Sequence, residues 1–343
     1  MRKRTAAVRA IRSYVPERKL TNEDLALEYP DWDVAKIFDK TGISVRGIAG
    51  PSECASDLGV VAAEKLFASG MAARSEVDFL IFCTQSPDYF LPTTACLMQD
   101  RLGLPTTCGA VDINQGCSGF VYGLSLAKGL IESGTSENVL LVTAETYSKH
   151  IHESDRSVRT IFGDGAAATL IGAEAGSEGG IGPFVLGTNG KGAPNLIVKA
   201  GGFRHPIGRA GDEGAGGLED SPSARHLYMN GAEIMGFTLQ TVPKLVNALL
   251  QKAAMEMQDV DYFIFHQANK FMLEQLQRKL RILPEKFCIN LQHYGNTVAS
   301  TIPMALELAL HEGQVSRGAK VMLVGFGVGY SWAGTILTLG EML

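Results

Sequence analysis

The stretch Glu76-Val77-Asp78-Phe79-Leu80-Ile81-Phe82 recurs in type as Asp259-Val260-Asp261-Tyr262-Phe263-Ile264-Phe265, 183 positions further along the chain. Each copy is a short apolar run that follows a helical pattern and precedes polar residues. Such a run between polar boundaries is typical of a buried parallel strand. The two copies therefore predict an α/β protein in which one strand–helix unit occurs twice.

The repeat extends beyond this pair of strands. Three further pairs of apolar runs follow at similar spacing: 110–113 with 287–290, 138–142 with 320–324, and 166–171 with 331–336. We infer two αβ halves with strands and helices in the same order, residues 1–173 and residues 174–343. The second half opens with an insert, residues 174–225, that is rich in Gly, Pro and charge and is predicted to be mostly loop.

Composition excludes several functional classes. Apolar residues make up 45% of the 343 residues, and the net charge of −5 comes without a basic stripe, so nucleic acid is not an expected partner. No apolar run reaches the roughly 18 residues that span a bilayer, and no signal-peptide pattern follows Met1, so we expect a cytoplasmic protein without membrane contact. The six cysteines form no CxxC pair, which argues against a disulfide framework and a metal site.

A strand-to-helix junction carries the first candidate catalytic residue. Gln115-Gly116-Cys117-Ser118-Gly119-Phe120 follows the strand predicted at 110–113 and opens an apolar helical pattern. A thiol at a helix N-terminus lies near free N–H groups and a partial positive charge, which stabilise a thiolate and lower its pKa. Cys117 is therefore a candidate nucleophile, and the alternative is a buried cysteine in a glycine-rich turn.

The second half of the repeat supplies two more polar motifs. Phe265-His266-Gln267-Ala268-Asn269 ends the second strand copy, and the carboxyl ends of parallel strands are where α/β sheets bind ligands. His293-Tyr294-Gly295-Asn296-Thr297 follows the run at 287–290, the counterpart of the strand before Cys117. Pseudo-twofold packing of the halves would bring Asn296 and Cys117 together. Alone, each motif also fits a structural role.

A glycine-rich turn, Gly325-Phe326-Gly327-Val328-Gly329, lies near the end of the chain. The GxGxG spacing suggests dinucleotide binding, but no βαβ unit and no suitably spaced acidic residue follow it, so we reject NAD. Its backbone N–H groups could instead serve an oxyanion hole.

In this order, the motifs resemble those of β-ketoacyl-acyl-carrier-protein synthase III, in the thiolase superfamily. The resemblance runs from Lys40-Thr41-Gly42-Ile43 through Cys117, Asp155-Arg156, and Ile161-Phe162-Gly163-Asp164-Gly165-Ala166 to the motifs at 266–269, 294–297 and 325–327. It implies a thiolase-like five-layer α-β-α-β-α sandwich. It also implies an acyltransferase that joins an acyl thioester to a malonyl thioester by decarboxylative Claisen condensation, through an acyl-cysteine, in fatty acid biosynthesis.

The resemblance further implies substrates, partners and residue roles. Coenzyme A thioesters would be substrates rather than bound cofactors, no metal is expected, the donor would be malonyl-acyl carrier protein or malonyl-CoA, and the protein would be a homodimer. Cys117 would carry the acyl group, while His266 and Asn296 would stabilise the enolate of the donor. The remaining implied roles are an oxyanion hole from the N–H groups of Cys117 and Val328, pantetheine contacts from Gly231 and Asn269, a nucleotide contact from Arg156, and a gate at Phe326.

Several positions depart from the family pattern. Val328 replaces a common Gly, and Lys36 aligns with the tryptophan that stacks on adenine, although Trp32 is close by. Phe271 aligns with a basic carrier-protein contact, and Leu91 aligns with a tunnel-lining Phe. These changes spare the chemistry, and we expect acetyl-CoA not to be the best acyl substrate.

Three other functions share parts of this residue set. Related thiolase-fold enzymes transfer acyl groups to other nucleophiles or condense them head to head. A non-catalytic partner subunit would be expected to have lost Cys117. Cysteine hydrolases also use Cys, His and Asn, but there the histidine activates the thiol, and the strand context of His266 and the duplication favour condensation.

Overall fold

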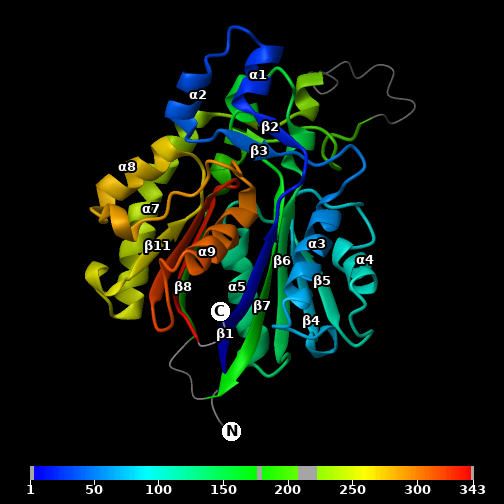
Figure 1. Ribbon diagram of the computed structural model, residues 1–343, viewed down its shortest axis with the longest axis vertical. Coiled ribbons are helices and arrows are strands. Elements are labelled where there is room, and N and C mark those ends of the chain that lie inside the picture. Colours follow the sequence, from blue (N-terminus) through cyan, green and yellow to red (C-terminus); the bar gives the residue numbers. More distant parts are fainter. Residues whose placement is uncertain (1–3, 176–179, 208–221, 341–343) are drawn as a thin grey trace.

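The structure is a computed structural model that describes residues 4–175, 180–207 and 222–340 of the chain. Two β-sheets form its centre, and helices cover and separate them (Figure 1). The glycine-rich stretch 211–217, which the sequence predicts to be loop, lies outside the described residues.

The first sheet has five strands in the order β1-β7-β6-β4-β5. Their bounds are β1 (Arg4–Tyr14), β4 (Phe79–Cys83), β5 (Gly109–Ile113), β6 (Asn138–Glu145) and β7 (Gly165–Ala175). β4, β5 and β6 are mutually parallel, whereas β7 and β1 pair antiparallel. The carboxyl ends of the three parallel strands therefore meet at one edge, which is where α/β sheets bind ligands.

The second sheet has four strands in the order β11-β12-β13-β8. Their bounds are β8 (Gly180–Thr188), β11 (Tyr262–Phe265), β12 (Lys320–Gly327) and β13 (Ser331–Thr338). β11 and β12 are parallel, and the other two pairs are antiparallel. This order matches β4-β6-β7-β1 strand for strand and in direction, so the duplication predicted from the sequence is confirmed.

Two parts of the second half differ from the sequence prediction. Residues 287–290 form no strand, and only an isolated parallel bridge joins Phe287 to Phe263. The insert 174–225 is not loop throughout, because β8 occupies residues 180–188. Because β8 contains three glycines and Pro183, its residue pattern does not predict a strand. These residues are tolerated because β8 is an edge strand that pairs on one side only. The boundary between residues 173 and 174 stays a prediction.

Helices form three layers around the sheets. Those outside the first sheet are α3 (Ala55–Ala68) and α4 (Thr94–Arg101), those between the sheets are α5 (Gly119–Glu132) and α9 (Thr301–His311), and those outside the second sheet are α7 (Gly231–Ala253) and α8 (Lys270–Leu280). Figure 1 shows α7 and α8 on one flank, α3 and α4 on the other, and α5 and α9 between them. This order of layers confirms the five-layer α-β-α-β-α sandwich.

Helical periodicity explains the middle layer. In α5, the buried residues Phe120, Leu124, Ala127 and Ile131 recur every three or four positions, so one face of the helix is apolar throughout. α5 contacts strands of both sheets. The turn before α5 is therefore held between the two halves of the molecule.

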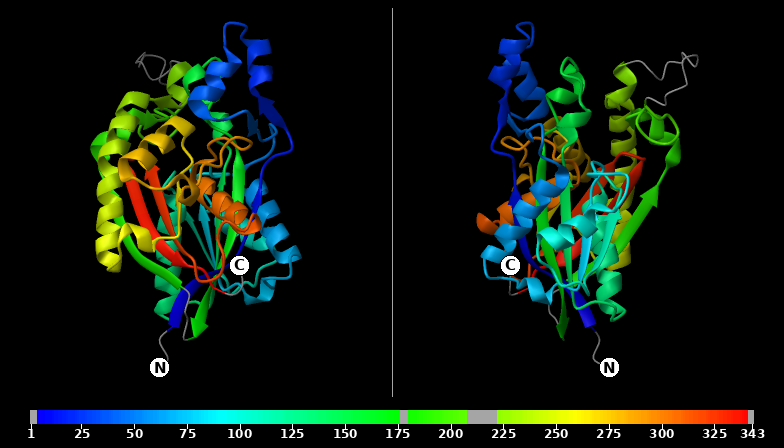
Figure 2. Two further views of the ribbon diagram at one scale, coloured as in Figure 1. Left: turned by 60° about the vertical axis from the view of Figure 1, so that its left-hand side comes forward. Right: turned by 90° about the vertical axis from the view of Figure 1, so that its right-hand side faces the viewer.

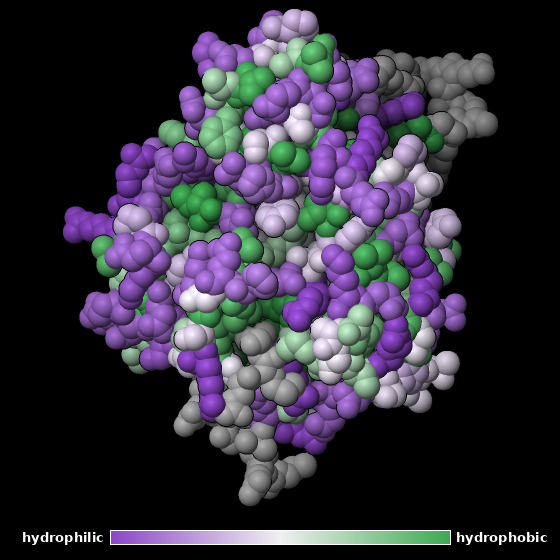
Figure 3. Space-filling view, in the orientation of Figure 1, coloured by the Kyte–Doolittle hydropathy of each residue, from purple (hydrophilic) through white to green (hydrophobic). Residues whose placement is uncertain are grey.

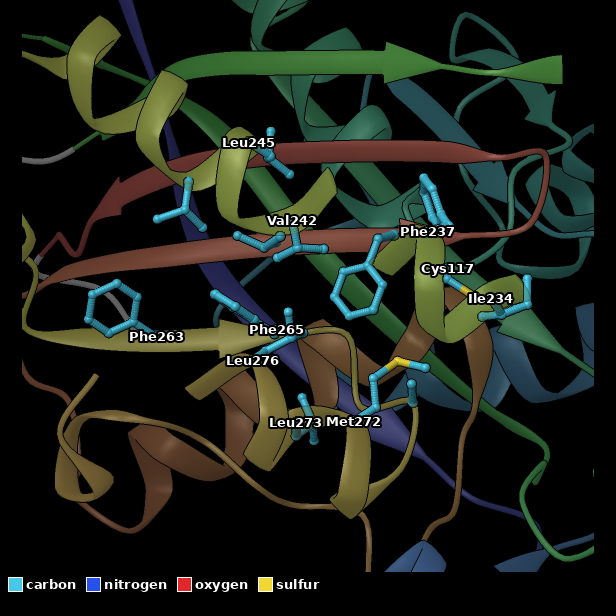
Figure 4. Close-up of a cluster of buried hydrophobic side chains, with 14 of the residues drawn as sticks. Cys117, Ile234, Phe237, Val242, Leu245, Phe263, Phe265, Met272, Leu273 and Leu276 are labelled. Atoms are coloured by element: carbon cyan, nitrogen blue, oxygen red, sulfur yellow. The ribbon is translucent and has the colours of Figure 1, made fainter. Parts of the chain in front are cut away.

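A large cluster of buried side chains lies between the second sheet and its outer helices (Figure 4). Val242 and Leu245 of α7 and Leu273 and Leu276 of α8 converge on Phe263 and Phe265 of β11. Figure 4 places Cys117 at one end of this cluster, which links the packing of the second half to the predicted nucleophile of the first.

Short elements form a cap over the end of the molecule at which β4 and β6 finish. They are β2 (Lys19–Thr21), α1 (Asn22–Glu28), α2 (Val34–Thr41), β3 (Val45–Gly47) and α6 (Arg156–Arg159). Both views in Figure 2 show α1 and α2 standing at this upper end, and α2 contacts α8 of the second half.

On the face seen in Figure 3, polar residues predominate and hydrophobic ones appear in small groups. None of the helices that the structure describes is long and apolar enough to span a bilayer.

Candidate active site

Cys117 lies in the turn between β5 and α5, against the end of β12. A Cβ atom at Gly327 would lie 2.8 Å from Cys117 Sγ, and one at Gly325 would lie 2.6 Å from Ser118 Cα. Real Cβ atoms essentially never approach so closely, so only glycine lets the two segments pack in this way. The glycine-rich turn is therefore a packing partner of the nucleophile's turn.

Burial dominates the electrostatics of the thiol. It raises the pKa of Cys117 to about 12, whereas backbone N–H groups of Val328 and Cys117 at the sulfur act to lower it. The sequence prediction of a lowered thiol pKa is therefore wrong in direction, because desolvation outweighs the N–H groups. The two N–H groups predicted to form an oxyanion hole nevertheless both lie at the sulfur atom.

His266 follows β11 and is almost fully buried. Its Nδ1 lies 2.7 Å from Thr301 Oγ1, and its Nε2 lies 3.4 Å from Asn296 Nδ2. Burial lowers the pKa of His266 to about 3, so the imidazole is neutral at ordinary pH. The ring of Phe326 packs edge-on against it, with 5.7 Å between the ring centroids.

Backbone hydrogen bonds tie Asn296 to the first half. Its N–H donates to the Ile161 carbonyl at 2.9 Å, and its carbonyl accepts from the Gly163 N–H at 3.1 Å. Its side-chain Oδ1 accepts from the Val298 N–H at 2.9 Å, which leaves Nδ2 directed toward His266. Val298 has φ 55°, a left-handed conformation that is strained for a β-branched residue.

These side chains share one cavity of about 340 Å³, here called the reaction cavity. Cys117, His266, Asn296 and Phe326 lie along it, and most of its other walls are apolar. Figure 4 shows Ile234 of α7 and Met272 of α8 beside Cys117, and both line the cavity. Lys40 and Thr41 of α2 also line it, so the cavity runs from the cap to the buried thiol.

The remaining predicted residues divide into two groups. Gly231, the first residue of α7, and Asn269 line the reaction cavity, and Asn269 also caps α8 by accepting from the Met272 N–H at 2.9 Å. Arg156 and Val328 do not line it. The Arg156 guanidinium lies over Trp32, 5.3 Å from the ring centroid, whereas Val328 lines a second cavity.

Trp32, four residues before the aligned position, is buried and stacks on Tyr29 with 4.6 Å between their ring centroids. Lys36 occupies the position at which the family pattern has a tryptophan, but Trp32 supplies an aromatic ring beneath Arg156.

Sequence reasoning missed two polar residues near these groups. Thr301, at the start of α9, contacts His266 Nδ1. Glu145 ends β6 and accepts hydrogen bonds from the Gln85 N–H at 2.9 Å and the Ser86 hydroxyl at 3.0 Å. Burial raises the pKa of Glu145 to about 8. A carboxyl group at the end of an apolar strand is a signal that could have identified Glu145.

Within the described ranges, no group of three His, Cys, Asp or Glu residues is placed to hold a metal ion.

Comparisons with known proteins give a consistent result. Residues 111–190 match the family model for 3-oxoacyl-[acyl-carrier-protein (ACP)] synthase III, and residues 250–339 match the model for its C-terminal part. The β-ketoacyl-[acyl-carrier-protein] synthase III 2 of Halalkalibacterium halodurans is 40% identical over 332 residues, which cover 97% of this chain and 96% of that protein.

Solved structures agree with the sequence matches. A crystal structure of a 3-oxoacyl-(acyl-carrier-protein) synthase III superposes with a TM-score of 0.92 at 54% identity, covering 98% of this chain and 100% of the other. The synthase from Burkholderia xenovorans gives a TM-score of 0.89 at 36% identity, covering 99% and 95%. The resemblance seen in the sequence is thus confirmed, and the chain belongs to the 3-oxoacyl-[acyl-carrier-protein] synthase III family of the thiolase superfamily.

Proposed function

We propose that this protein is an acyltransferase that condenses an acyl-CoA with malonyl-acyl carrier protein to give a β-ketoacyl thioester and carbon dioxide, in fatty acid biosynthesis. The observation that carries the proposal is the reaction cavity, in which a thiol from one half meets an imidazole and an amide from the other. The relatives' names, which contain acyl carrier protein, support that carrier for the donor. None of the relatives named above refers to malonyl-CoA, so the donor proposed is the carrier-protein thioester.

In the first half-reaction, Cys117 Sγ attacks the carbonyl carbon of the acyl-CoA. The carbon–sulfur bond to coenzyme A breaks, the acyl group remains on Cys117, and coenzyme A leaves as a thiol that carries the cysteine proton. The N–H groups of Cys117 and Val328 at the sulfur would bind the oxygen that becomes negative. Removing one such donor typically lowers the rate about 10²–10³-fold.

In the second half-reaction, the malonyl carboxylate leaves as carbon dioxide, and its electron pair passes to the thioester enolate. His266 Nε2 and Asn296 Nδ2 lie 3.4 Å apart, so both can direct a hydrogen at one oxygen of the donor. The carbanion attacks the acyl carbonyl, a carbon–carbon bond forms, and Cys117 leaves and takes up a proton. A neutral His266 suits this role because it can donate a hydrogen bond without being charged.

This geometry favours condensation over hydrolysis. In a cysteine hydrolase the histidine takes the thiol proton, which requires a hydrogen bond between the two side chains. Among the described residues, His266 Nδ1 contacts Thr301 and Nε2 lies beside Asn296, and no hydrogen bond joins His266 to Cys117.

The entry route for the substrate arm follows the lining of the reaction cavity. Gly231 and Asn269 would contact pantetheine, and Phe326 would gate the space beside His266. Arg156, whose guanidinium group lies over the Trp32 ring, would contact the nucleotide.

The test is intact mass after incubation with butyryl-CoA, followed by release of labelled carbon dioxide from malonyl-acyl carrier protein. One acyl adduct is expected in the wild type and in the control Cys96→Ala, which removes an exposed thiol, and none is expected in Cys117→Ala. His266→Ala and Asn296→Ala should retain the adduct but lose carbon dioxide release. An unchanged adduct in Cys117→Ala would contradict the proposal.

A further inference from the structure

A second cavity, of about 240 Å³, adjoins the turn that carries Cys117. Leu196 lines both this cavity and the reaction cavity, and Val328 lines the second one while its backbone N–H lies at the Cys117 sulfur. The Tyr147 ring, which lines the second cavity, packs on Phe162 of the reaction cavity with 5.1 Å between centroids. The second cavity is therefore adjacent to Cys117, with Val328 and Leu196 at the boundary between the two cavities.

Gln85 brings a polar group to the Cys117 end of the second cavity. Its Oε1 would lie 2.6 Å from a Cβ atom at Gly116, the residue before the nucleophile. The same oxygen accepts a hydrogen bond from the Tyr147 hydroxyl at 3.1 Å. Glu145 holds this segment in place, because its carboxyl group accepts from the Gln85 backbone N–H.

The walls of this cavity combine polar, uncharged groups with apolar side chains, which are those of Leu196, Ile197, Val198, Leu227 and Val328. Beside Gln85 and Tyr147 it is lined by Asn114 and His150, and the His150 ring packs edge-on against Tyr147 with 5.7 Å between centroids. Burial lowers the pKa of His150, so this imidazole is neutral at ordinary pH. The described lining includes no Asp, Glu, Lys or Arg.

Hydrogen-bonding capacity remains at these side chains. The Gln85 amide has two N–H hydrogens, and its Nε2 contacts Asn114 Oδ1 at the long distance of 3.5 Å. The Tyr147 oxygen donates its one hydrogen to Gln85 and can still accept another. A plain alkyl chain would exclude water from these groups and give no hydrogen bond in return, which is unfavourable.

We infer that the acyl group carried by Cys117 is a short chain with a neutral oxygen function, a hydroxyl or a ketone, that hydrogen-bonds to Gln85 and Tyr147 in the second cavity. The inference rests on the proposed function and narrows its acyl substrate. An acyl chain that ends in a carboxylate does not fit, because no cation lines the described part of the cavity to pair with it.

The test compares two thioesters that differ by one hydroxyl, 3-hydroxybutyryl-CoA and butyryl-CoA. The rate of adduct formation on Cys117 is followed by intact mass. The hydroxylated chain is expected to react about tenfold faster or more, because a site built around a substrate hydroxyl discriminates against the analogue without it. Tyr147→Phe and Gln85→Met should each bring the ratio of the two rates toward one.

Tyr122→Phe is the matched control, since its hydroxyl contacts the Gly187 carbonyl and does not line the second cavity. It should keep the wild-type ratio. Equal rates for the two thioesters in the wild type, or an unchanged ratio in both cavity variants, would overturn this inference and leave the proposed function intact. Absence of any adduct from either thioester would overturn the proposed function and this inference with it.

Discussion

The hydroxyl of Thr301 is placed to select which nitrogen of His266 carries a proton. It has one hydrogen and two neighbours that can accept it, His266 Nδ1 at 2.7 Å and the Val298 carbonyl at 3.0 Å. When the hydroxyl donates to Nδ1, the imidazole proton lies on Nε2, which faces Asn296. The proposed stabilisation of the enolate requires this tautomer.

We therefore predict that Thr301→Val slows malonyl decarboxylation more than acyl loading. The loss is expected to be about tenfold or more, because the bond that orients the ring and selects the tautomer is removed. Carbon dioxide release and adduct formation are measured separately. Thr301→Ser keeps the hydroxyl and should restore most of the decarboxylation, whereas equal losses in both half-reactions would contradict the role assigned to Thr301.

Glu145 couples protonation to stability. Burial raises its pKa from 4.5 to about 8, so between these values the folded protein holds a proton that the unfolded chain releases. The contribution of this proton to the free energy of unfolding is complete below pH 4.5. It declines as pH rises toward 8, by up to about 1.4 kcal/mol per pH unit.

Replacing Glu145 by Gln should flatten this pH dependence. The amide has no proton to release, so the free energy of unfolding should fall less between about pH 5 and about pH 8 than in the wild type. Urea unfolding at several pH values measures the two slopes. Part of the slope should remain, because burial also raises the pKa of Asp164. Identical slopes in the two proteins would show that Glu145 is ionised in the fold.

Among the secondary-structure elements, the approach of β12 to the turn before α5 is the tightest constraint on the thiol. A Cβ atom at Gly327 would lie 2.8 Å from Cys117 Sγ and 2.9 Å from Cys117 Cβ. Because the strand and the turn are both buried, neither can move away without loss of packing. Added bulk at this position must displace the sulfur.

The corresponding prediction is that Gly327→Ala lowers the rate of acyl loading by about 100-fold, as expected for a displacement of about 1 Å at a reacting group. Gly236→Ala in α7 is the control, since no atom lies within 4 Å of a Cβ atom there. It should retain loading and raise the free energy of unfolding by about 0.5–1 kcal/mol, through helix propensity. Normal loading in Gly327→Ala would mean that the turn adapts.

At the scale of the whole molecule, β5 leaves the first sheet with an open edge. It is the last strand in the order (Figure 1). Val111 within it is exposed. Tyr89, Phe90 and Leu91, which follow the neighbouring strand, are also exposed. Proteins rarely leave such an edge uncovered beside apolar side chains, so a second copy of this chain is the expected cover.

We predict a homodimer at micromolar concentration, measured by light scattering. Val111→Glu should shift the mass toward the monomer, because two carboxylates would face one another across paired β5 strands. Leu27→Glu, which changes an exposed apolar residue of α1, should remain dimeric. A monomeric wild type would contradict the prediction.

The strand pattern and the duplication were predictable from the sequence because both are local properties. β4, β6, β7, β12 and β13 are continuous apolar runs, and their order in one half repeats in the other. β8 was not predictable, since its glycines and Pro183 are acceptable only at the sheet edge that β13 provides. The run at 287–290 likewise looked like a strand, but only Phe287 pairs with β11.

The sequence alone determined the fold class, the family resemblance and the choice of Cys117, His266 and Asn296 as candidates. Only the tertiary structure decided which side chains share a cavity, that Thr301 contacts His266, and that Gln85 and Tyr147 line a second cavity beside the nucleophile. It also decided that the Cys117 pKa is raised rather than lowered. The physical reason is that hydrophobic periodicity depends on residues that are neighbours in the chain. Desolvation and hydrogen bonding instead depend on segments that are distant in the chain and meet only when the two halves pack.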